Sequence, residues 1–438
     1  MIPTRHSLSR WVGNHPLRVL ALILLFALVV DAGWLWTHPP SLDSGETSHW
    51  WPIVVNVAQG RGYSGCFPEY FPFCGPANQV TAAREPVPVL LFAAVASLTT
   101  ESLLPAVVVE IALNSGILIG IFLLAQWLAG PHVAAVAALV WSLYLPALGL
   151  ILQVSGELVA TLAVVWGVFF LVRACRTRNA RDWLSAGACV ALGTLSRSAV
   201  MVLGPTLGVV ALLRTAVPTR GRWRGVGLFA SIFLLTMSPW IVRNFAVFGH
   251  PVLGSTLSGY NLYRQNYQLS HRDYLRIVAG AEGGRAIQEL LVRRRDLRGT
   301  ENEAEMSAVY AREALRIIEA WPLRYLHLSA HRFLALWFNW GVLEEYGVRP
   351  RLRDYLLSGE QAILLLLAIG GLGYLGREAW PLAASVAAYS VAHVLVNGQL
   401  RYIVPAMPLV MVLSAVTLRR ALRYLPEPRN KEEASVFG

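Results

Sequence analysis

The chain has 438 residues, of which 55% are hydrophobic and only 14% are charged, and its mean hydropathy is +0.50. One soluble core cannot hide so much apolar side chain, so the composition excludes an ordinary soluble protein and indicates a lipid environment. The formal net charge is +11, but the basic residues cluster in short stretches between apolar runs. This is the positive-inside pattern of a polytopic membrane protein, so no nucleic-acid partner is predicted.

The first predicted span covers residues 17–36, and three arginines, at positions 5, 10 and 18, lie before it or at its start. These charges place the N-terminus in the cytoplasm and residues 38–100 outside, as the first external loop. The apolar run is too long for a signal-peptide core, so an uncleaved helix is expected. Within the loop, residues 47–59 and 86–98 form helical stretches that are too short or too flanked by charge to span, and we expect them in the membrane interface.

The rest of the chain alternates apolar runs with basic or polar connections, and we predict an all-α polytopic membrane protein with about 10–11 transmembrane helices in a single domain, residues 1–438. Arginine-rich connections at 173–181 and 214–224 fall on the cytoplasmic side, and a basic tail at 419–431 favours an even span count. Residues 244–322 form a second external insert, with a charged helical stretch at 285–318. The further spans are expected at 103–128, 133–151, 158–172, 183–195, 200–213, 226–242, 325–340, 355–375, 380–396 and 403–418, the run at 325–340 being interfacial if its histidines and arginine keep it from spanning.

Cys66 and Cys74 share the first loop and are separated by a short aromatic and proline-rich link. If that loop faces an oxidising compartment, a disulfide between them is expected. The other two cysteines, Cys175 and Cys189, fall near or within membrane segments.

Asp43 and Glu46 stand just beyond the outer end of the first span, where one helical turn could put both carboxylates on one face. A partly buried carboxylate at the membrane surface suits general-base work on an acceptor hydroxyl or amine. The alternative is that both are acids of a helix N-terminus that only complement the helix dipole.

Arg84 and Glu85 precede the second short helical stretch. Arg84 fits the phosphate of a lipid-linked substrate and equally a lipid headgroup. Glu157 and Arg197 lie near the outer ends of their spans, where an isolated charge is costly and needs a partner. They fit either a functional site or a simple structural pair.

Two further arginines end or begin predicted spans. Arg243, followed by Asn244, closes the seventh span and fits a snorkelling anchor or a ligand. Arg401 and Tyr402 open the last span, which on an even count starts outside. The arginines of these four segments are therefore expected on one side of the membrane, where an anionic lipid phosphate would explain them.

This ordered set of motifs resembles the polyprenyl-phosphate-sugar-dependent glycosyltransferases of the GT-C class, in particular bacterial members related to protein mannosyltransferases and aminoarabinose lipid A transferase. The resemblance extends over nearly the whole chain. Its motifs are an acid after the first span, Ala58-Gln59-Gly60-Arg61-Gly62-Tyr63, Thr-Ala-Ala-Arg-Glu-Pro at 81–86, Ser155-Gly156-Glu157, Leu195-Ser196-Arg197, Pro-Trp-x-x-Arg-Asn at 239–244 and Arg401-Tyr402-x-x-Pro405.

The resemblance implies an inverting sugar transfer from a lipid phosphate on the outer face of the inner (plasma) membrane, with an aspartate of the first loop as base. Carried over to this chain, that role falls on Asp43 or Glu46. The chain departs here from the family pattern of adjacent acids, or of one aspartate at a fixed distance before the Gly-x-Gly-Tyr stretch, because Gly45 precedes Glu46 and Asp43 lies farther upstream. The implied partners are membrane lipid, a polyprenyl-phosphate sugar donor and an acceptor that is a lipid, a glycan or a protein. The donor is a substrate, so no cofactor is expected.

Other classes of protein predict other patterns. The sequence has no His, Cys and acid cluster with metal-ligand spacing, so no metal is predicted, and it has neither a Walker-type loop nor a Rossmann glycine fingerprint. A transporter or flippase for a lipid-linked or anionic solute would also need arginines near the membrane, but it predicts broken helices in two corresponding halves, and we find no such repeat. A scaffold without catalysis would leave the external acids dispensable.

Overall fold

The computed structural model describes residues 5–43, 45–75, 79–214, 219–276, 278, 280–340 and 349–424. Over these residues the secondary structure is helical, and the one β contact is an isolated antiparallel bridge between Ser64 and Val80. The predicted all-α polytopic membrane architecture is confirmed.

Six helical stretches of the described chain are long and apolar enough to cross a membrane. A helix pairs its backbone groups internally, which is what allows such stretches to lie in hydrocarbon. The stretch Leu352–Val394 contains two helices, and the total of about ten or eleven spans remains a prediction. The six stretches consist of α2 (Pro16–Thr37), α5 (Leu104–Ala129), α8 (Glu157–Thr177), most of α11 (Thr219–Phe248), α17 (Leu352–Leu375) with η3 (Gly376–Ala379) and α18 (Trp380–Val394), and α19 (Leu400–Ile403) with η4 (Val404–Ala406) and most of α20 (Met407–Tyr424).

Shorter helices connect and flank these stretches. They are α1 (Arg5–Asn14), α3 (Thr47–Ala58), α4 (Pro86–Ala96), α6 (Pro131–Ser142), α7 (Leu145–Leu150), α9 (Ala180–Thr194), η1 (Ser198–Val202), α10 (Leu203–Arg214) and α15 (Pro322–Phe338). The prediction of one continuous span over 133–151 is wrong, because α6 ends at Ser142 and α7 starts anew at Leu145. Pro146 explains the break, since proline lacks the N–H that a continuous helix needs and disfavours helical backbone in the preceding residue.

The polar region before α15 contains four helical segments, α12 (Leu257–Asn266), η2 (Tyr267–Ser270), α13 (Gly280–Arg293) and α14 (Glu303–Ala320). The single helical stretch predicted at 285–318 is therefore two helices. Asn302 starts the second one, because its side chain accepts hydrogen bonds from the N–H groups of Ala304 and Glu305, while the Glu305 carboxylate accepts from the N–H of Asn302. Gly299, with φ of +78°, provides the turn before it.

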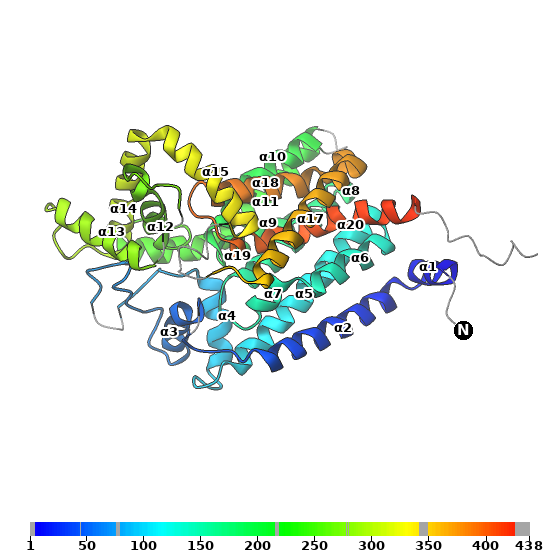
Figure 1. The fold of residues 1–438 in the computed structure, drawn as a ribbon, viewed down its shortest axis with the longest axis horizontal. Helices are drawn as coiled ribbons and strands as arrows, with labels where there is room; N and C mark the ends of the chain where they lie inside the picture. Colours follow the sequence, from blue (N-terminus) through cyan, green and yellow to red (C-terminus); the bar gives the residue numbers. More distant parts are fainter. Residues whose placement is uncertain are drawn as a thin grey trace, which may run out of the picture.

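Figure 1 shows the polar helices α12, α13 and α14 gathered with α3 at one end of the long axis. The N-terminal helix α1 and the C-terminal end of α20 lie at the opposite end. We term α3, the described part of residues 59–85 and α12–α14 the head. A second apolar core, apart from the larger core of the bundled helices, includes Trp50, Phe71, Tyr263 and Tyr310 of the head and extends to α4 and the first turn of α5.

Candidate active site

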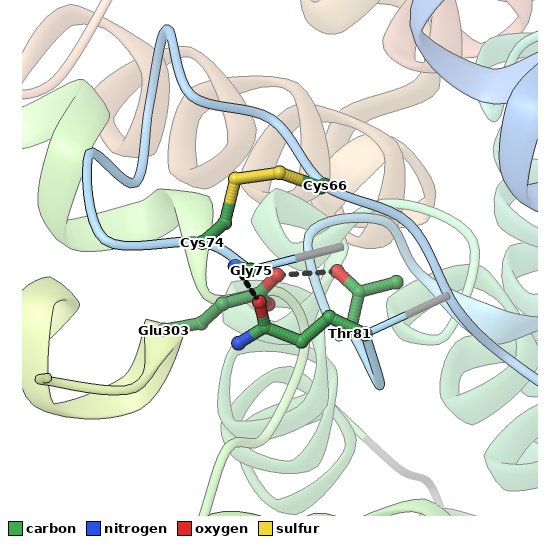
Figure 2. The surroundings of a disulfide bond; sticks show 6 residues. Cys66, Cys74, Gly75, Thr81 and Glu303 are labelled. Carbon is green, nitrogen blue, oxygen red and sulfur yellow. Dashed lines mark hydrogen bonds between the residues drawn. A yellow bond between two sulfur atoms is a disulfide. The ribbon is translucent and has the colours of Figure 1, made fainter. Parts of the chain in front are cut away.

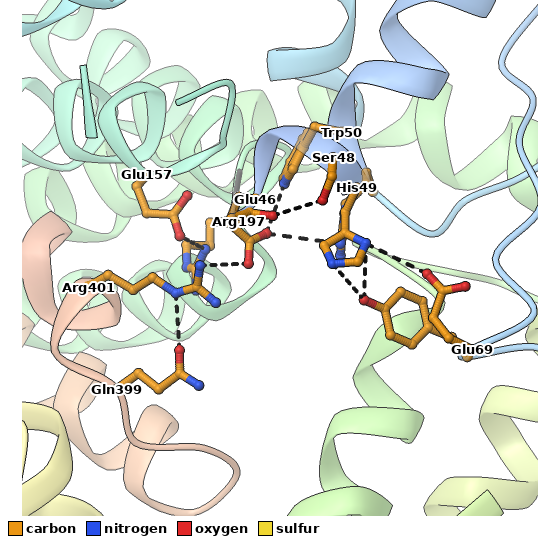
Figure 3. Close-up of polar contacts among 12 residues, drawn as sticks. Glu46, Ser48, His49, Trp50, Glu69, Glu157, Arg197, Gln399 and Arg401 are labelled. Atoms are coloured by element: carbon orange, nitrogen blue, oxygen red, sulfur yellow. Dashed lines mark hydrogen bonds and ion pairs between the residues drawn. The ribbon is translucent and has the colours of Figure 1, made fainter. Parts of the chain in front are cut away.

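Glu46 lies at the start of α3, where it reaches across to the bundle. Gly45 makes the turn before it with φ of +50°, a backbone conformation that favours glycine. Nη1 of Arg401 lies 2.7 Å from Oε1 of Glu46, and the indole N–H of Trp50 donates to Oε2 at 3.2 Å. Nη2 of Arg84 lies 4.0 Å from the same Oε2. Figure 3 shows Glu46 together with Trp50 and Arg401. The first loop and the last apolar stretch therefore meet at one carboxylate.

The charges around Glu46 decide its protonation. Burial alone would raise the pKa of this carboxyl, but the guanidinium groups of Arg401, Arg84 and Arg197 outweigh burial and hold its pKa well below the usual range. Glu46 is consequently ionised, and it remains so for as long as the arginines face it.

Arg197 is held by a second buried acid. Its Nη1 lies 2.6 Å from Oε1 of Glu157, the fully buried first residue of α8. The two motifs can approach because residue 156 is glycine, since a Cβ at Gly156 would collide with the carbonyl oxygen of Ser196. The Arg197 guanidinium also lies 4.4 Å from the centre of the Tyr402 ring, and that of Arg401 lies 5.0 Å from it. Two cations thus flank one aromatic ring.

Glu85 ties the first loop to the bundle. Its Oε1 accepts hydrogen bonds from the backbone N–H of Ser198, at 2.9 Å, and from the Ser198 hydroxyl, at 2.5 Å. The neighbouring Arg84 guanidinium lies over the rings of Trp50 and Tyr70, at 5.5 and 5.9 Å from their centres. These contacts fix the position of Arg84 beside Glu46.

Arg243 contacts the first loop and its neighbour Asn244, and these contacts do not include Glu46. Arg243 donates to the carbonyl oxygens of Thr81, at 2.9 Å, and Tyr63, at 3.3 Å, and to Oδ1 of Asn244, at 2.7 Å. Its guanidinium lies against the rings of Tyr63, Trp240 and Phe248. This pair therefore holds the first loop in place.

Glu303 is a second anchor of the same loop, and the sequence does not single it out. Its carboxylate accepts from the hydroxyls of Thr81, at 2.6 Å, and Thr256, at 2.9 Å, and from the N–H of Ala82, at 2.9 Å. Figure 2 shows this contact beside the disulfide that joins Cys66 to Cys74. The first residue of α14 is thereby joined to the loop that carries Arg84.

A cavity of about 920 Å³ opens between the head and the bundle. Four of the predicted site residues do not line it, namely Asp43, Glu157, Arg243 and Asn244. Asp43 is exposed, and Glu157 is fully buried against Arg197. The predicted site residues that line it are Glu46, Arg84, Glu85, Arg197, Arg401 and Tyr402.

Several lining residues have no role assigned from the sequence, among them His49, Glu69, Tyr70, Tyr260 and Arg264. His49 follows Glu46 by one helical turn, a spacing that could have indicated it. The others reach the cavity only through the packing of the head. Over the described residues no group of three or more His, Cys, Asp or Glu side chains could hold a metal ion.

The arrangement combines a positive surface with an ionised carboxylate. Arginines bind phosphate through paired, charge-assisted hydrogen bonds, and they stabilise negative charge that develops on a leaving group. A carboxylate within reach of the same ligand can take up a proton. The cavity therefore suits the transfer of a group away from a phosphate.

Part of the chain is similar to a known protein family. Residues 83–242 match the family described as dolichyl-phosphate-mannose-protein mannosyltransferase. No curated protein sequence matches the chain. The resemblance to GT-C glycosyltransferases that the motifs indicated is confirmed by this family match and by solved structures of the same fold.

Two of these structures are of the oligosaccharyltransferase AglB from Archaeoglobus fulgidus. The one tethered to an acceptor peptide has a TM-score of 0.60 and 14% identity, and covers 94% of this chain and 50% of its own. The complex with an inhibitory peptide and a dolichol-phosphate has a TM-score of 0.57 and 14% identity, and covers 95% and 52%. ArnT from Cupriavidus metallidurans bound to undecaprenyl phosphate has a TM-score of 0.40 and 14% identity, and covers 92% and 78%. This chain spans about half the length of AglB.

Proposed function

We propose that this multi-pass membrane protein, which has the GT-C glycosyltransferase fold, moves a sugar from a polyprenyl phosphate to an acceptor. The observation that carries the proposal is the cavity of about 920 Å³ in which the Glu46 carboxylate meets the guanidinium groups of Arg84, Arg197 and Arg401. A polyprenyl-phosphate sugar already contains a good leaving group, so the protein has to bind the anion, take a proton from the acceptor and exclude water.

The arginines bind the donor phosphate. Arg401 and Arg84 both face Glu46 and both line the cavity, so an incoming phosphate competes with that carboxylate for the same cations. As the bond between the anomeric carbon and the phosphate oxygen breaks, its electron pair goes to the phosphate, and the fixed guanidinium charges stabilise it. The presence of dolichol-phosphate in an AglB complex supports a lipid phosphate as the ligand.

Glu46 is the proposed base. Once the phosphate neutralises Arg401 and Arg84, the pKa of Glu46 rises toward its usual range, and the carboxylate becomes able to accept a proton. The acceptor oxygen gives its proton to Glu46 and attacks the anomeric carbon from the side opposite the phosphate, so the configuration inverts. Asp43 is the weaker candidate because it is exposed and does not line the cavity.

We place the reaction on the outer face of the inner membrane, with the N-terminus in the cytoplasm. This placement is supported by the arginine-rich connections at 173–181 and 214–224 and by the basic tail at 419–431, since basic residues are enriched on the cytoplasmic side. The head also lies at the opposite end of the molecule from α1 and the end of α20 (Figure 1).

The test is a transfer assay with the full chain in liposomes and a polyprenyl-phosphate hexose labelled in the sugar, together with a membrane extract as acceptor source. We expect label to leave the lipid donor and free polyprenyl phosphate to form. Movement of intact labelled donor across the bilayer without bond cleavage would instead indicate a flippase and contradict the proposal.

A further inference from the structure

The wall of the cavity that belongs to the head contains a loop closed by a disulfide. Cys66 and Cys74 are bonded, with Cα atoms 5.6 Å apart, and residues 67–73 lie between them. The hydroxyl of Tyr310 on α14 donates to the carbonyl oxygen of Tyr70 at 2.8 Å, which joins the loop to the polar helices. Glu69 and Tyr70 therefore line the cavity from a loop that is held at two points, by the disulfide and by Tyr310.

Glu69 faces His49 of α3. Nδ1 of His49 lies 3.6 Å from Oε1 of Glu69, and the Tyr70 hydroxyl lies 3.4 Å from the same nitrogen. The two side chains are 35% and 45% exposed, so a ligand in the cavity can reach them. Burial alone would raise the pKa of Glu69, but its contact with His49, a backbone hydrogen bond and the charge of Arg84 together lower the pKa. The lowered pKa favours the ionised carboxylate, whose oxygens can accept hydrogen bonds from a ligand.

Aromatic rings line the same wall. The rings of Tyr70 and Tyr260 lie 5.0 Å apart at an angle of 49°, and the Arg264 guanidinium lies 5.5 Å from the centre of the Tyr260 ring. Tyr260 and Arg264 come from α12, so the wall joins the first loop to the polar helices. An aromatic surface with a few placed polar groups is the usual composition of a small-molecule site.

Figure 3 shows Glu46 between two groups, with Arg197 and Arg401 on one side and His49 with Glu69 on the other. The arginine side suits the donor phosphate. The other side has acceptor and donor groups for hydroxyls and ring faces for the apolar face of a sugar. Its ionised Glu69 disfavours an acceptor that carries negative charge there.

We propose that His49, Glu69, Tyr70 and Tyr260 form the acceptor subsite, and that it takes the hydroxyl-rich ring of a carbohydrate. This inference rests on the proposed sugar transfer and names the acceptor class for it. Glu69 accepts from a ring hydroxyl, His49 positions the attacking hydroxyl toward Glu46, and Tyr70 contacts the sugar ring. Tyr260 is only 2% exposed and supports the Tyr70 ring by packing against it. The carbohydrate belongs either to a free glycan or to a glycolipid.

The test uses the full chain in liposomes, the labelled polyprenyl-phosphate hexose and three acceptor probes: a methyl hexoside, the same hexose on a single alkyl chain, and a threonine-containing peptide. For Glu69→Gln and His49→Gln we expect the KM of the sugar acceptor to rise about tenfold or more, with the KM of the donor within twofold of wild type. Opening the loop with Cys66→Ser and Cys74→Ser together should raise the same KM. We expect Glu69→Asp, which keeps the carboxylate, to restore most of the affinity for the sugar acceptor. Such a recovery would show that the carboxylate binds the acceptor and does not only stabilise the loop.

Asp296→Asn is the matched control, because Asp296 is an exposed acid that pairs with Arg294 and does not line the cavity. Use of the methyl hexoside would indicate a free glycan, and use of the alkyl glycoside alone a glycolipid. Transfer to the peptide but to neither sugar would overturn the subsite, as would an unchanged sugar KM in both variants. Absence of donor cleavage by wild type with any acceptor would contradict the proposed function itself.

Discussion

Nη1 of Arg401 lies 2.7 Å from Oε1 of Glu46, so an arginine near the start of the last apolar stretch is paired with the carboxylate that directly precedes α3, and both residues line the cavity. The pair occupies the position that a donor phosphate needs. In our account, donor binding exchanges one anion for another at Arg401, and this exchange changes the basicity of Glu46. The donor would thereby activate the base that acts on the acceptor.

The exchange predicts a specific pH dependence. In the free protein the pKa of Glu46 is held well below its ordinary value of 4.5 by Arg401, Arg84 and Arg197. Because the pKa is lowered, the ion pairs stabilise the fold above the unfolded-state pKa and are lost only as pH falls through the lower folded-state value. With phosphate bound the pKa rises, so the acidic limb of kcat should lie at higher pH than that of kcat/KM for the donor.

Initial rates from about pH 4 to 8 at saturating and limiting donor should show an acidic limb in kcat but none in kcat/KM for the donor, whose limb lies below this range. Coincident limbs, or a limb of kcat at the lower pH, would contradict the exchange. The pH at which the protein unfolds should be measured in parallel, so that loss of structure is not read as protonation of the base.

Arg401 should dominate the affinity for the donor. Removing its charge in Arg401→Gln should weaken the binding of polyprenyl phosphate by about 10- to 100-fold, since a hydrogen bond to a charged group contributes about 1.5–3 kcal/mol. Arg401→Lys keeps the positive charge but cannot form two parallel hydrogen bonds to the phosphate, so its affinity for polyprenyl phosphate should lie between those of wild type and Arg401→Gln. Inhibition of transfer by polyprenyl phosphate gives the affinity.

Arg298→Gln is the control for that series, because Arg298 is an exposed arginine of the head that pairs with Glu305 and lies outside the cavity. It should bind polyprenyl phosphate as wild type does. An Arg401→Gln variant that binds equally well would remove Arg401 from the phosphate site.

Glu303 should stabilise the fold without touching the substrate. Glu303→Ala leaves the donors of Thr81, Ala82 and Thr256 without their acceptor, and should lower the free energy of unfolding by about 2–4 kcal/mol. Glu303→Gln keeps one oxygen acceptor and should lose less. Thermal unfolding measures both, with the exposed Glu319→Gln as control. A Glu303→Ala variant as stable as wild type would show that the loop does not depend on this anchor.

The apolar helices and several site residues could be predicted from the sequence because their signals are local. Long apolar runs locate α2, α5 and α8, and short motifs identify Arg84, Arg197 and Arg401. Positive-inside reasoning also places these arginines on one side of the membrane. Their meeting at Glu46 depends on the packing of distant segments, as the tight contact of Gly156 with Ser196 illustrates.

Other features could not be predicted because their cause is tertiary. Arg243 carries the same motif signal as Arg197, but the rings of Tyr63 and Trp240 and the carbonyl of Thr81 hold it outside the cavity. Glu69 reaches the cavity because a disulfide and Tyr310 hold its loop. No local pattern distinguishes such a residue from any exposed loop acid.

The most direct measurement of the central claim is the separate determination of kcat and donor affinity for Glu46→Gln, with Asp43→Asn as the matched control. We predict that Glu46→Gln lowers kcat for sugar transfer by about 10²-fold or more, the usual contribution of a general base. Its affinity for polyprenyl phosphate should not weaken, because a competing anion has been removed from Arg401. Asp43→Asn should transfer sugar at nearly the wild-type rate. Full activity of Glu46→Gln, or loss of activity in Asp43→Asn alone, would contradict the account.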